Sequence, residues 1–108
     1  MAQSSPAPRL RRLPIAVALG CEVRVATGLR ARLLGLAHLD LDEAGPGLLI
    51  PRCSSIHTFG MRFALDVYFL DEDGAAIEGR RRVPRGRVVR CRRAAAVVEL
   101  PSCSSLNI

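Results

Sequence analysis

The sequence predicts a mostly β domain of the α+β class: a compact antiparallel or mixed sheet, or a barrel-like sheet, with one helix near the N-terminus. Short apolar runs of two-residue periodicity recur between turn-forming Gly, Pro and Asp residues. Only one segment has the spacing of an amphipathic helix. Three of the four aromatic side chains fall within residues 63–69, so we expect the centre of the core there.

The length of the chain sets its domain organisation. A chain of 108 residues has room for one hydrophobic core and not for two. We therefore expect residues 14–101 to form a single globular domain. Residues 1–13 are polar and basic, which predicts a disordered tail, and residues 102–108 form an atypical short C-terminus.

The first half of the chain predicts two strands, one helix and a loop. Residues 14–26 form two short alternating runs about Gly20-Cys21, which indicates a pair of strands. Thr27 is a suitable N-cap for a helix across Leu29–Ala37. Residues 39–47 are rich in Asp, Gly and Pro, which predicts a loop.

The second half predicts strands only. Phe63–Asp71 (FALDVYFLD) is the strongest candidate, because apolar side chains on both of its faces are typical of a strand inside a sheet. Residues 72–74 (EDG) predict a hairpin turn. Further strands are expected at residues 48–50, 55–61 with a break at Gly60, 75–78, 88–89 and 94–100.

The N-terminal residues also resemble an export signal. Three arginines precede the apolar run Leu13–Leu19, and Gly20-Cys21 follows, which is the layout of a bacterial lipoprotein signal. The run is short and contains Pro14, so a first strand is the preferred interpretation. We expect a cytoplasmic protein, with acylation of Cys21 as the alternative. No segment approaches the ~20 apolar residues of a membrane-spanning helix, so no transmembrane segment is predicted.

Three blocks of sequence carry a family resemblance: GLRARLLGLA at Gly28–Ala37, CSSIHTFGMRFALDVYFLDEDG at Cys53–Gly74 and CRRAAAVVELP at Cys91–Pro101. Together they resemble the bacterial and archaeal family called domain of unknown function 192, over residues 15–101. The resemblance implies a compact β-rich fold with one helix near its start. It implies no established activity, substrate or cofactor.

The chain departs from that family after Pro101. The resemblance implies roughly one more strand there, whereas only residues 102–108 follow in this sequence. The C-terminus is therefore expected to be truncated or altered. An edge left open at this end of the sheet would allow self-association.

Asp66 is the first candidate functional residue, because it interrupts an apolar strand between Leu65 and Val67. Burying an unpaired carboxylate costs several kcal/mol, so we expect Asp66 to be buried and hydrogen-bonded. One interpretation is a structural pin that holds a neighbouring loop or an arginine. The other is a ligand-binding or acid–base group at the rim of the sheet.

His57 is the second candidate, with Cys53 and Ser55 close to it in sequence. These residues, with Asp66, predict the polar site of a small binding module, and this is the preferred function. The alternative is a small hydrolase-like enzyme that uses Ser55 or Cys53 with His57. No G-x-S-x-G motif surrounds either serine at 54 or 55, so no catalytic residue is assigned.

Metal and cofactor sites are not predicted. The four cysteines lie far apart and form no C-x-x-C pair, whereas structural zinc sites need ligands that are close in sequence. Cys53 and His57 supply two ligands at most, and the other histidine, His38, belongs to a different segment. We expect reduced thiols, no metal and no cofactor.

The stretch Arg80–Arg93 contains eight arginines and no acidic residue, in a chain whose net charge is +6. Such a run is usually a solvated face. The functional alternative is an electrostatic adaptor that binds an anionic partner, either nucleic acid or an acidic protein. No aromatic residue follows Phe69, which argues against a base-stacking platform on this stretch. The candidate anion-binding residues are Arg80, Arg81, Arg82, Arg85, Arg87 and Arg90.

Overall fold

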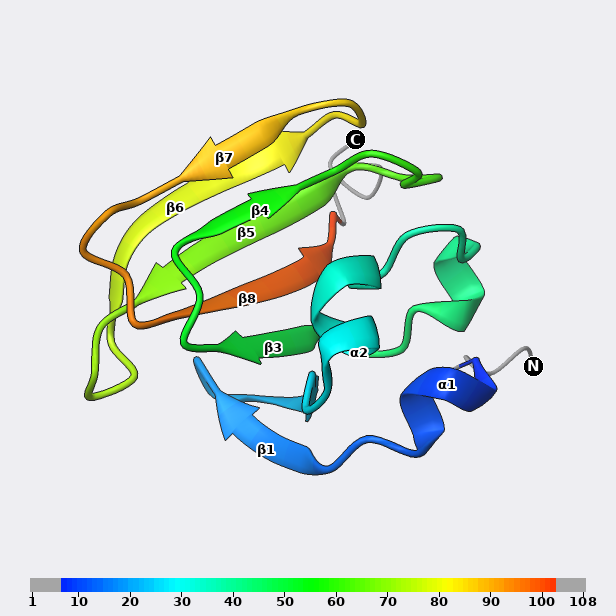
Figure 1. Cartoon of the computed structure of the whole chain (residues 1–108), viewed down its shortest axis with the longest axis horizontal. Coiled ribbons are helices and arrows are strands. Elements are labelled where there is room, and N and C mark those ends of the chain that lie inside the picture. Colours follow the sequence, from blue (N-terminus) through cyan, green and yellow to red (C-terminus); the bar gives the residue numbers. More distant parts are fainter. Residues whose placement is uncertain (1–6, 103–108) are drawn as a thin grey trace.

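A computed structural model of the chain describes residues 7–102. Its main element is a six-stranded mixed sheet with the order β1-β2-β3-β8-β5-β6 (Figure 1). The pair β2–β3 is parallel and the other pairs are antiparallel. The strands are β1 (Ile15–Ala18), β2 (Cys21–Val25), β3 (Leu48–Pro51), β5 (Leu65–Leu70), β6 (Ala76–Val83) and β8 (Ala96–Pro101).

A second layer covers one face of this sheet. It consists of the helix α2 (Leu29–Leu34) and of a two-stranded ribbon, β4 (Ser55–His57) with β7 (Val88–Arg90). In Figure 1 the ribbon lies in front of β5 and β6, and α2 lies in front of β8 and β3. Side chains of both parts, such as Leu36 after α2, Ile56 and Val89, join the main hydrophobic core.

The strand β8 supplies the floor below this second layer. Val97 of β8 and its neighbours Val67 and Phe69 of β5 belong to the main core, whereas Val98 belongs to a smaller cluster on the opposite face. Because side chains alternate between the two faces of a strand, Glu99 must point to the same face as Val97. Glu99 also lies directly opposite Val67, which confirms this orientation.

The predicted central strand is confirmed. β5 pairs with β6 on one side and with β8 on the other, and five of its six residues are buried. The β1–β2 hairpin and the helix within residues 27–38 are confirmed as well. Gly28 rather than Thr27 is the N-cap of α2, so the predicted cap was wrong.

Two other predictions need correction. The sheet is not closed into a barrel, because β1 and β6 each have one neighbouring strand within residues 7–102. Part of the expected tail, residues 1–13, is folded: α1 (Pro8–Arg11) starts on a proline and buries Leu10, which is 2% exposed. The chain therefore contains a second short helix before the predicted one.

The predicted open C-terminal edge does not lie at β8. β8 lies between β3 and β5 and is paired on both sides, so the last described strand offers no free edge. The free edges of the described sheet belong to β1 and β6. Residues 103–108, which make up most of the atypical C-terminus, lie outside the described residues, as do residues 1–6 of the expected tail.

The helices of residues 7–102 are short, and none of them has the length and apolarity needed to cross a membrane.

Candidate functional site

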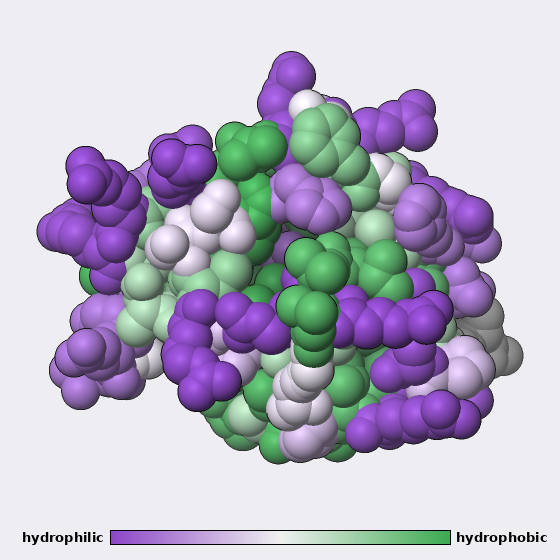
Figure 2. Space-filling view, in the orientation of Figure 1, coloured by the Kyte–Doolittle hydropathy of each residue, from purple (hydrophilic) through white to green (hydrophobic). Residues whose placement is uncertain are grey.

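A pocket of about 400 Å³ lies between the two parts of the second layer, with β8 beneath it. Figure 2 shows apolar side chains in the middle of this face, framed by hydrophilic ones and with a hollow beside them. The walls come from α2 and the residue after it on one side, and from the β4–β7 ribbon on the other. The lining residues are Arg32, Leu33, Leu34, Gly35, Ser55, Ile56, His57, Phe59, Val88 and Glu99.

Glu99 is the one carboxyl group in this lining, and it is almost completely buried, with 2% of the residue exposed. Its carboxyl group accepts a backbone hydrogen bond from Leu36, but its Oε1 atom has no hydrogen-bond partner. Burial raises the pKa of Glu99 to about 7, and the bond from Leu36 opposes this shift in part. The pocket therefore contains a carboxyl group that changes charge near neutral pH.

Gly35 makes room for this carboxyl group. α2 ends at Gly35, whose φ of 52° lies in the left-handed region that favours glycine. A Cβ atom at this position would lie 2.9 Å from Oε1 of Glu99. The backbone conformation at the helix end therefore favours glycine here, and a methyl group in its place would force the carboxyl group of Glu99 to shift.

His57 joins the two walls of the pocket. The backbone N–H of Phe59 donates to Nδ1 of His57 at 3.2 Å, so Nδ1 carries no proton in this arrangement. The proton of the neutral ring is then on Nε2, which lies 3.2 Å from the carbonyl oxygen of Leu33 and donates to it. The bond from Nε2 to Leu33 thus attaches β4 to α2, while the bond from Phe59 to Nδ1 is local and orients the ring.

The rim of the pocket is apolar and exposed. Leu33 is 60% exposed, Phe59 55% and Val88 59%, and all three line the pocket. The ring of Phe59 also lies beside that of His57, with 5.6 Å between the centroids. Apolar side chains gathered at the mouth of a pocket are typical of a binding site.

Arg32 is the only arginine in the lining, and its guanidinium is bonded to backbone carbonyl oxygens rather than to Glu99. Its guanidinium donates to the carbonyl oxygens of Pro51 and Arg52, the latter at 3.0 Å. The ion pairs within residues 7–102 are Arg62–Asp40 and Arg80–Glu78, and neither involves Glu99. The buried carboxyl group consequently has no counter-charge in this part of the chain.

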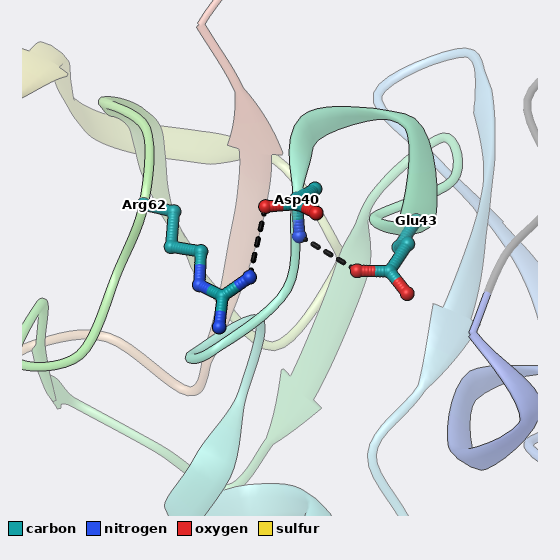
Figure 3. A network of polar contacts seen from close by, with 3 residues as sticks. All are labelled: Asp40, Glu43 and Arg62. Atoms are coloured by element: carbon teal, nitrogen blue, oxygen red, sulfur yellow. Dashed lines mark hydrogen bonds and ion pairs between the residues drawn. The ribbon is translucent and has the colours of Figure 1, made fainter.

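The loops that leave the two walls are tied together at one end of the site. Nη1 of Arg62 lies 2.9 Å from Oδ1 of Asp40, and the N–H of Asp40 donates to Oε1 of Glu43 at 2.9 Å (Figure 3). The N–H of His38 also donates to the carbonyl oxygen of Gly60 at 2.7 Å. The segment after α2 is therefore anchored to the segment after β4.

Asp66 does not belong to this pocket. It is 8% exposed, and its Oδ1 accepts the backbone N–H of Arg82 at 2.9 Å. The pairing of β5 with β6 shifts register between Leu65 and Val67, so Asp66 fills an irregularity of the ladder. The prediction that Asp66 is buried and hydrogen-bonded is confirmed, and its partner is a backbone N–H.

Only two of the other three predicted site residues share the pocket. Ser55 and His57 line the pocket, whereas Cys53 does not. The thiol of Cys53 donates to the carbonyl oxygen of Ser55 at 3.1 Å. In the described part of the chain no hydrogen bond joins Cys53 or Ser55 to His57, and no three His, Cys, Asp or Glu side chains are grouped to hold a metal ion.

Sequence reasoning missed Glu99. The signal that identified Asp66 was an acidic residue inside an apolar strand, and the same signal is present in AAAVVEL. Glu99 lies near the end of that run, where a charged residue usually faces solvent. Its burial follows from the position of β8 between β3 and β5, which local periodicity does not reveal.

The predicted anion-binding arginines are exposed and lie on β6, the β6–β7 connection and β7. A shallow groove of about 290 Å³ is lined by Arg80, Arg81, Arg82 and Arg87 together with apolar residues of β6 and β7. Arg80 pairs with Glu78 at 2.5 Å, so part of its charge is neutralised. Arg85 and Arg90 are exposed but do not line this groove.

The fold and pocket define a small β-rich domain with one carboxyl-lined cavity under a short helix. The model of the family DUF192, described as an uncharacterized ACR, matches residues 15–105. The chain belongs to this family, as its three sequence blocks predicted. None of the curated proteins matches the chain.

Two crystal structures show the same fold. A protein of Sinorhizobium meliloti 1021, described as a "putative transcription regulator", is 18% identical, with a TM-score of 0.65 over 86% of this chain and 81% of that one. A protein of unknown function from Novosphingobium aromaticivorans is 13% identical, with a TM-score of 0.60 over 95% of this chain and 91% of that one. At these identities the likeness concerns the fold alone.

Proposed function

We propose that this protein is a small binding module whose pocket between α2, β4–β7 and β8 holds a small amphipathic ligand. One observation carries this proposal: Oε1 of Glu99 is buried at the inner end of the pocket and has no hydrogen-bond partner. Buried polar atoms are almost always paired, and an unpaired one costs about 1–3 kcal/mol. A ligand that hydrogen-bonds to Oε1 would recover this energy.

The rest of the pocket supports an amphipathic ligand. Apart from Arg32, Ser55, His57 and Glu99, the lining is apolar or glycine, and Leu33, Phe59 and Val88 are exposed at the rim. Covering such surface contributes roughly 25 cal/mol per Å². A volume of about 400 Å³ lies in the lower part of the range of ~300–1,000 Å³ that small-molecule sites occupy.

The geometry of His57 favours binding over nucleophilic catalysis. A general base needs a ring nitrogen directed at the nucleophile, and both nitrogens of His57 are engaged with backbone groups of Phe59 and Leu33. The thiol of Cys53 is directed at a carbonyl oxygen. These contacts support a scaffold role for His57, which holds the pocket walls together.

A screen of small fragments by amide chemical-shift mapping tests the proposal. We expect fragments with an apolar body and one polar group to shift the resonances of residues 32–35, 55–59 and 99. Gly35→Ala should abolish these shifts, because its methyl group would occupy the space beside Glu99.

Gly20→Ala is the matched control for this screen. Gly20 also has a positive φ, but a Cβ there would have no atom within 4 Å, so ligand shifts should persist. The proposal fails if no fragment affects the pocket, or if Gly35→Ala binds as the unaltered chain does.

A second candidate function is contact with an anionic partner through the arginines of residues 80–90. Their exposure and the groove along Arg80, Arg81, Arg82 and Arg87 support it. Retention on heparin should then fall steeply with salt. The triple variant Arg81→Gln, Arg85→Gln, Arg87→Gln should elute earlier than a variant with Arg12, Arg30 and Arg52 changed to Gln. If the two variants elute at the same salt concentration, retention depends only on net charge, and the proposed anion-binding surface is refuted.

We also propose that the protein is cytoplasmic. The apolar run before Cys21 is built into the sheet as β1, and Cys21 is the first residue of β2. This supports a folded Cys21 over an acylated one. The mass of the N-terminus of the protein from its native host tests the point, and a lipid-modified Cys21 start would refute it.

A further inference from the structure

We propose that the ligand of this pocket carries a cationic amine, which pairs with the carboxylate of Glu99, on a small apolar body. This inference rests on the binding function proposed above and specifies the class of its ligand. It follows from the apolar lining around Glu99 and from the lack of a positively charged partner for its carboxylate among residues 7–102.

The carboxyl group of Glu99 has a backbone hydrogen-bond donor beside it but no positively charged side chain paired with it. The backbone of Leu36 donates one hydrogen bond to it, and Oε1 stays unpaired. Buried carboxylates in proteins are generally paired with a cation. A cationic group is therefore the partner that this site lacks.

No side chain among residues 7–102 forms an ion pair with Glu99. The guanidinium of Arg9, which comes from α1, is held by the carbonyl oxygens of Gly35 and Ala37. The charged and titratable groups that share the lining with Glu99 are Arg32 of α2 and His57 of β4, while β7 contributes only Val88. The guanidinium of Arg32 is held by the carbonyl oxygens of Pro51 and Arg52, and His57 by Leu33 and Phe59. The positive charge must come with the ligand.

The energetics favour an amine over a neutral donor. A hydrogen bond between an ionised donor and an ionised acceptor is roughly twice as strong as a neutral one, and it is least screened in a water-poor cavity. The apolar rim of Leu33, Phe59 and Val88 then contacts the body of the ligand. A short alkyl or single-ring amine matches a volume of about 400 Å³.

The charge state of Glu99 makes the binding of an amine dependent on pH. With a pKa of about 7, Glu99 is ionised in about 3% of molecules at pH 5.5 and in about 90% at pH 8. An alkyl amine stays protonated over this range, as lysine does with its pKa of about 10.4. Affinity for the amine should therefore rise roughly 30-fold from pH 5.5 to pH 8.

Calorimetric titrations of the full chain with three probes of similar shape test this inference: 2-phenylethylamine, 2-phenylethanol and 3-phenylpropionate. At pH 8 we expect the amine to bind at least ten times more tightly than the alcohol, and the acid to bind least. The amine should release about half a proton from the protein at pH 7, seen as a difference between buffers of unequal ionisation enthalpy. This readout needs no variant.

Glu99→Gln gives the second measurement. It should remove the preference for the amine over the alcohol and flatten the pH profile, with amide spectra that confirm folding. Equal binding of amine and alcohol, tighter binding of the acid, or an unchanged pH profile in Glu99→Gln would overturn the amine inference while leaving the pocket as a binding site. If none of the three probes, and no fragment, shifts pocket resonances, the binding function itself fails.

Discussion

Gly35 and Glu99 meet at the inner end of the pocket, so closely that a Cβ on Gly35 would lie 2.9 Å from Oε1 of Glu99. The residues are 64 positions apart in the chain, at the end of α2 and near the end of β8. Gly35 therefore has two roles. Its left-handed conformation ends the helix, and its lack of a side chain leaves space for the carboxyl group of Glu99. Four predictions follow from this and related contacts.

Replacing Gly35 with alanine should destabilise the protein by about 2–4 kcal/mol, because the new methyl group adds left-handed strain to a steric conflict with Glu99. Urea unfolding measures the change. Gly20→Ala, which adds strain without a neighbouring atom, should cost only about 1 kcal/mol. Equal losses for the two variants would show that Gly35 matters only for its backbone conformation.

Stability should fall between pH 4.5 and pH 7 because of Glu99. The pKa of Glu99 rises from its ordinary value of 4.5 to about 7 on folding, so the native state holds a proton that the unfolded chain releases over this range. The unfolded state then binds fewer protons, and the free energy of unfolding decreases as pH rises, by roughly 3 kcal/mol in total. Glu99→Gln should lack this decline. A pH profile identical in both proteins would rule out the raised pKa.

Asp66→Asn should reduce stability by at most about 1–3 kcal/mol and leave pocket binding unchanged. The amide oxygen of Asn can still accept the backbone N–H of Arg82, the one hydrogen bond that the side chain of Asp66 makes among the described residues. Asp66→Ala, which leaves that N–H unpaired, should cost more. Lost binding with unchanged melting in Asp66→Asn would make Asp66 a ligand-binding group after all.

Arg62→Gln should change the free energy of unfolding by less than about 1 kcal/mol, even though it breaks the ion pair with Asp40. The side chains of the pair are 54% and 63% exposed, so water screens their attraction. Hydrogen exchange at His38, which donates to Gly60, should show whether the anchored loops still stay together. A loss of several kcal/mol would mean that the loop tie stabilises the whole sheet.

Much of the local structure was predictable because it depends on patterns within a few residues. The alternation about Gly20-Cys21 predicted the β1–β2 hairpin, and the doubly apolar run at residues 63–71 predicted β5 with neighbours on both sides. The acid inside that run predicted a buried, bonded Asp66. His57 and Ser55, two of the candidate site residues, both line the pocket.

By itself, then, the sequence determined the family and most of the strands, together with the longer helix. It also determined that the buried carboxylate of Asp66 in β5 needs a hydrogen-bond donor. Only the tertiary structure decided which polar groups share a pocket. β8 enters between β3 and β5, which turns Glu99 under Gly35 and away from solvent, while Asp66 faces the β6 ladder instead. The physical reason is that alternation decides which side of a strand a residue occupies, whereas long-range pairing decides what covers that side.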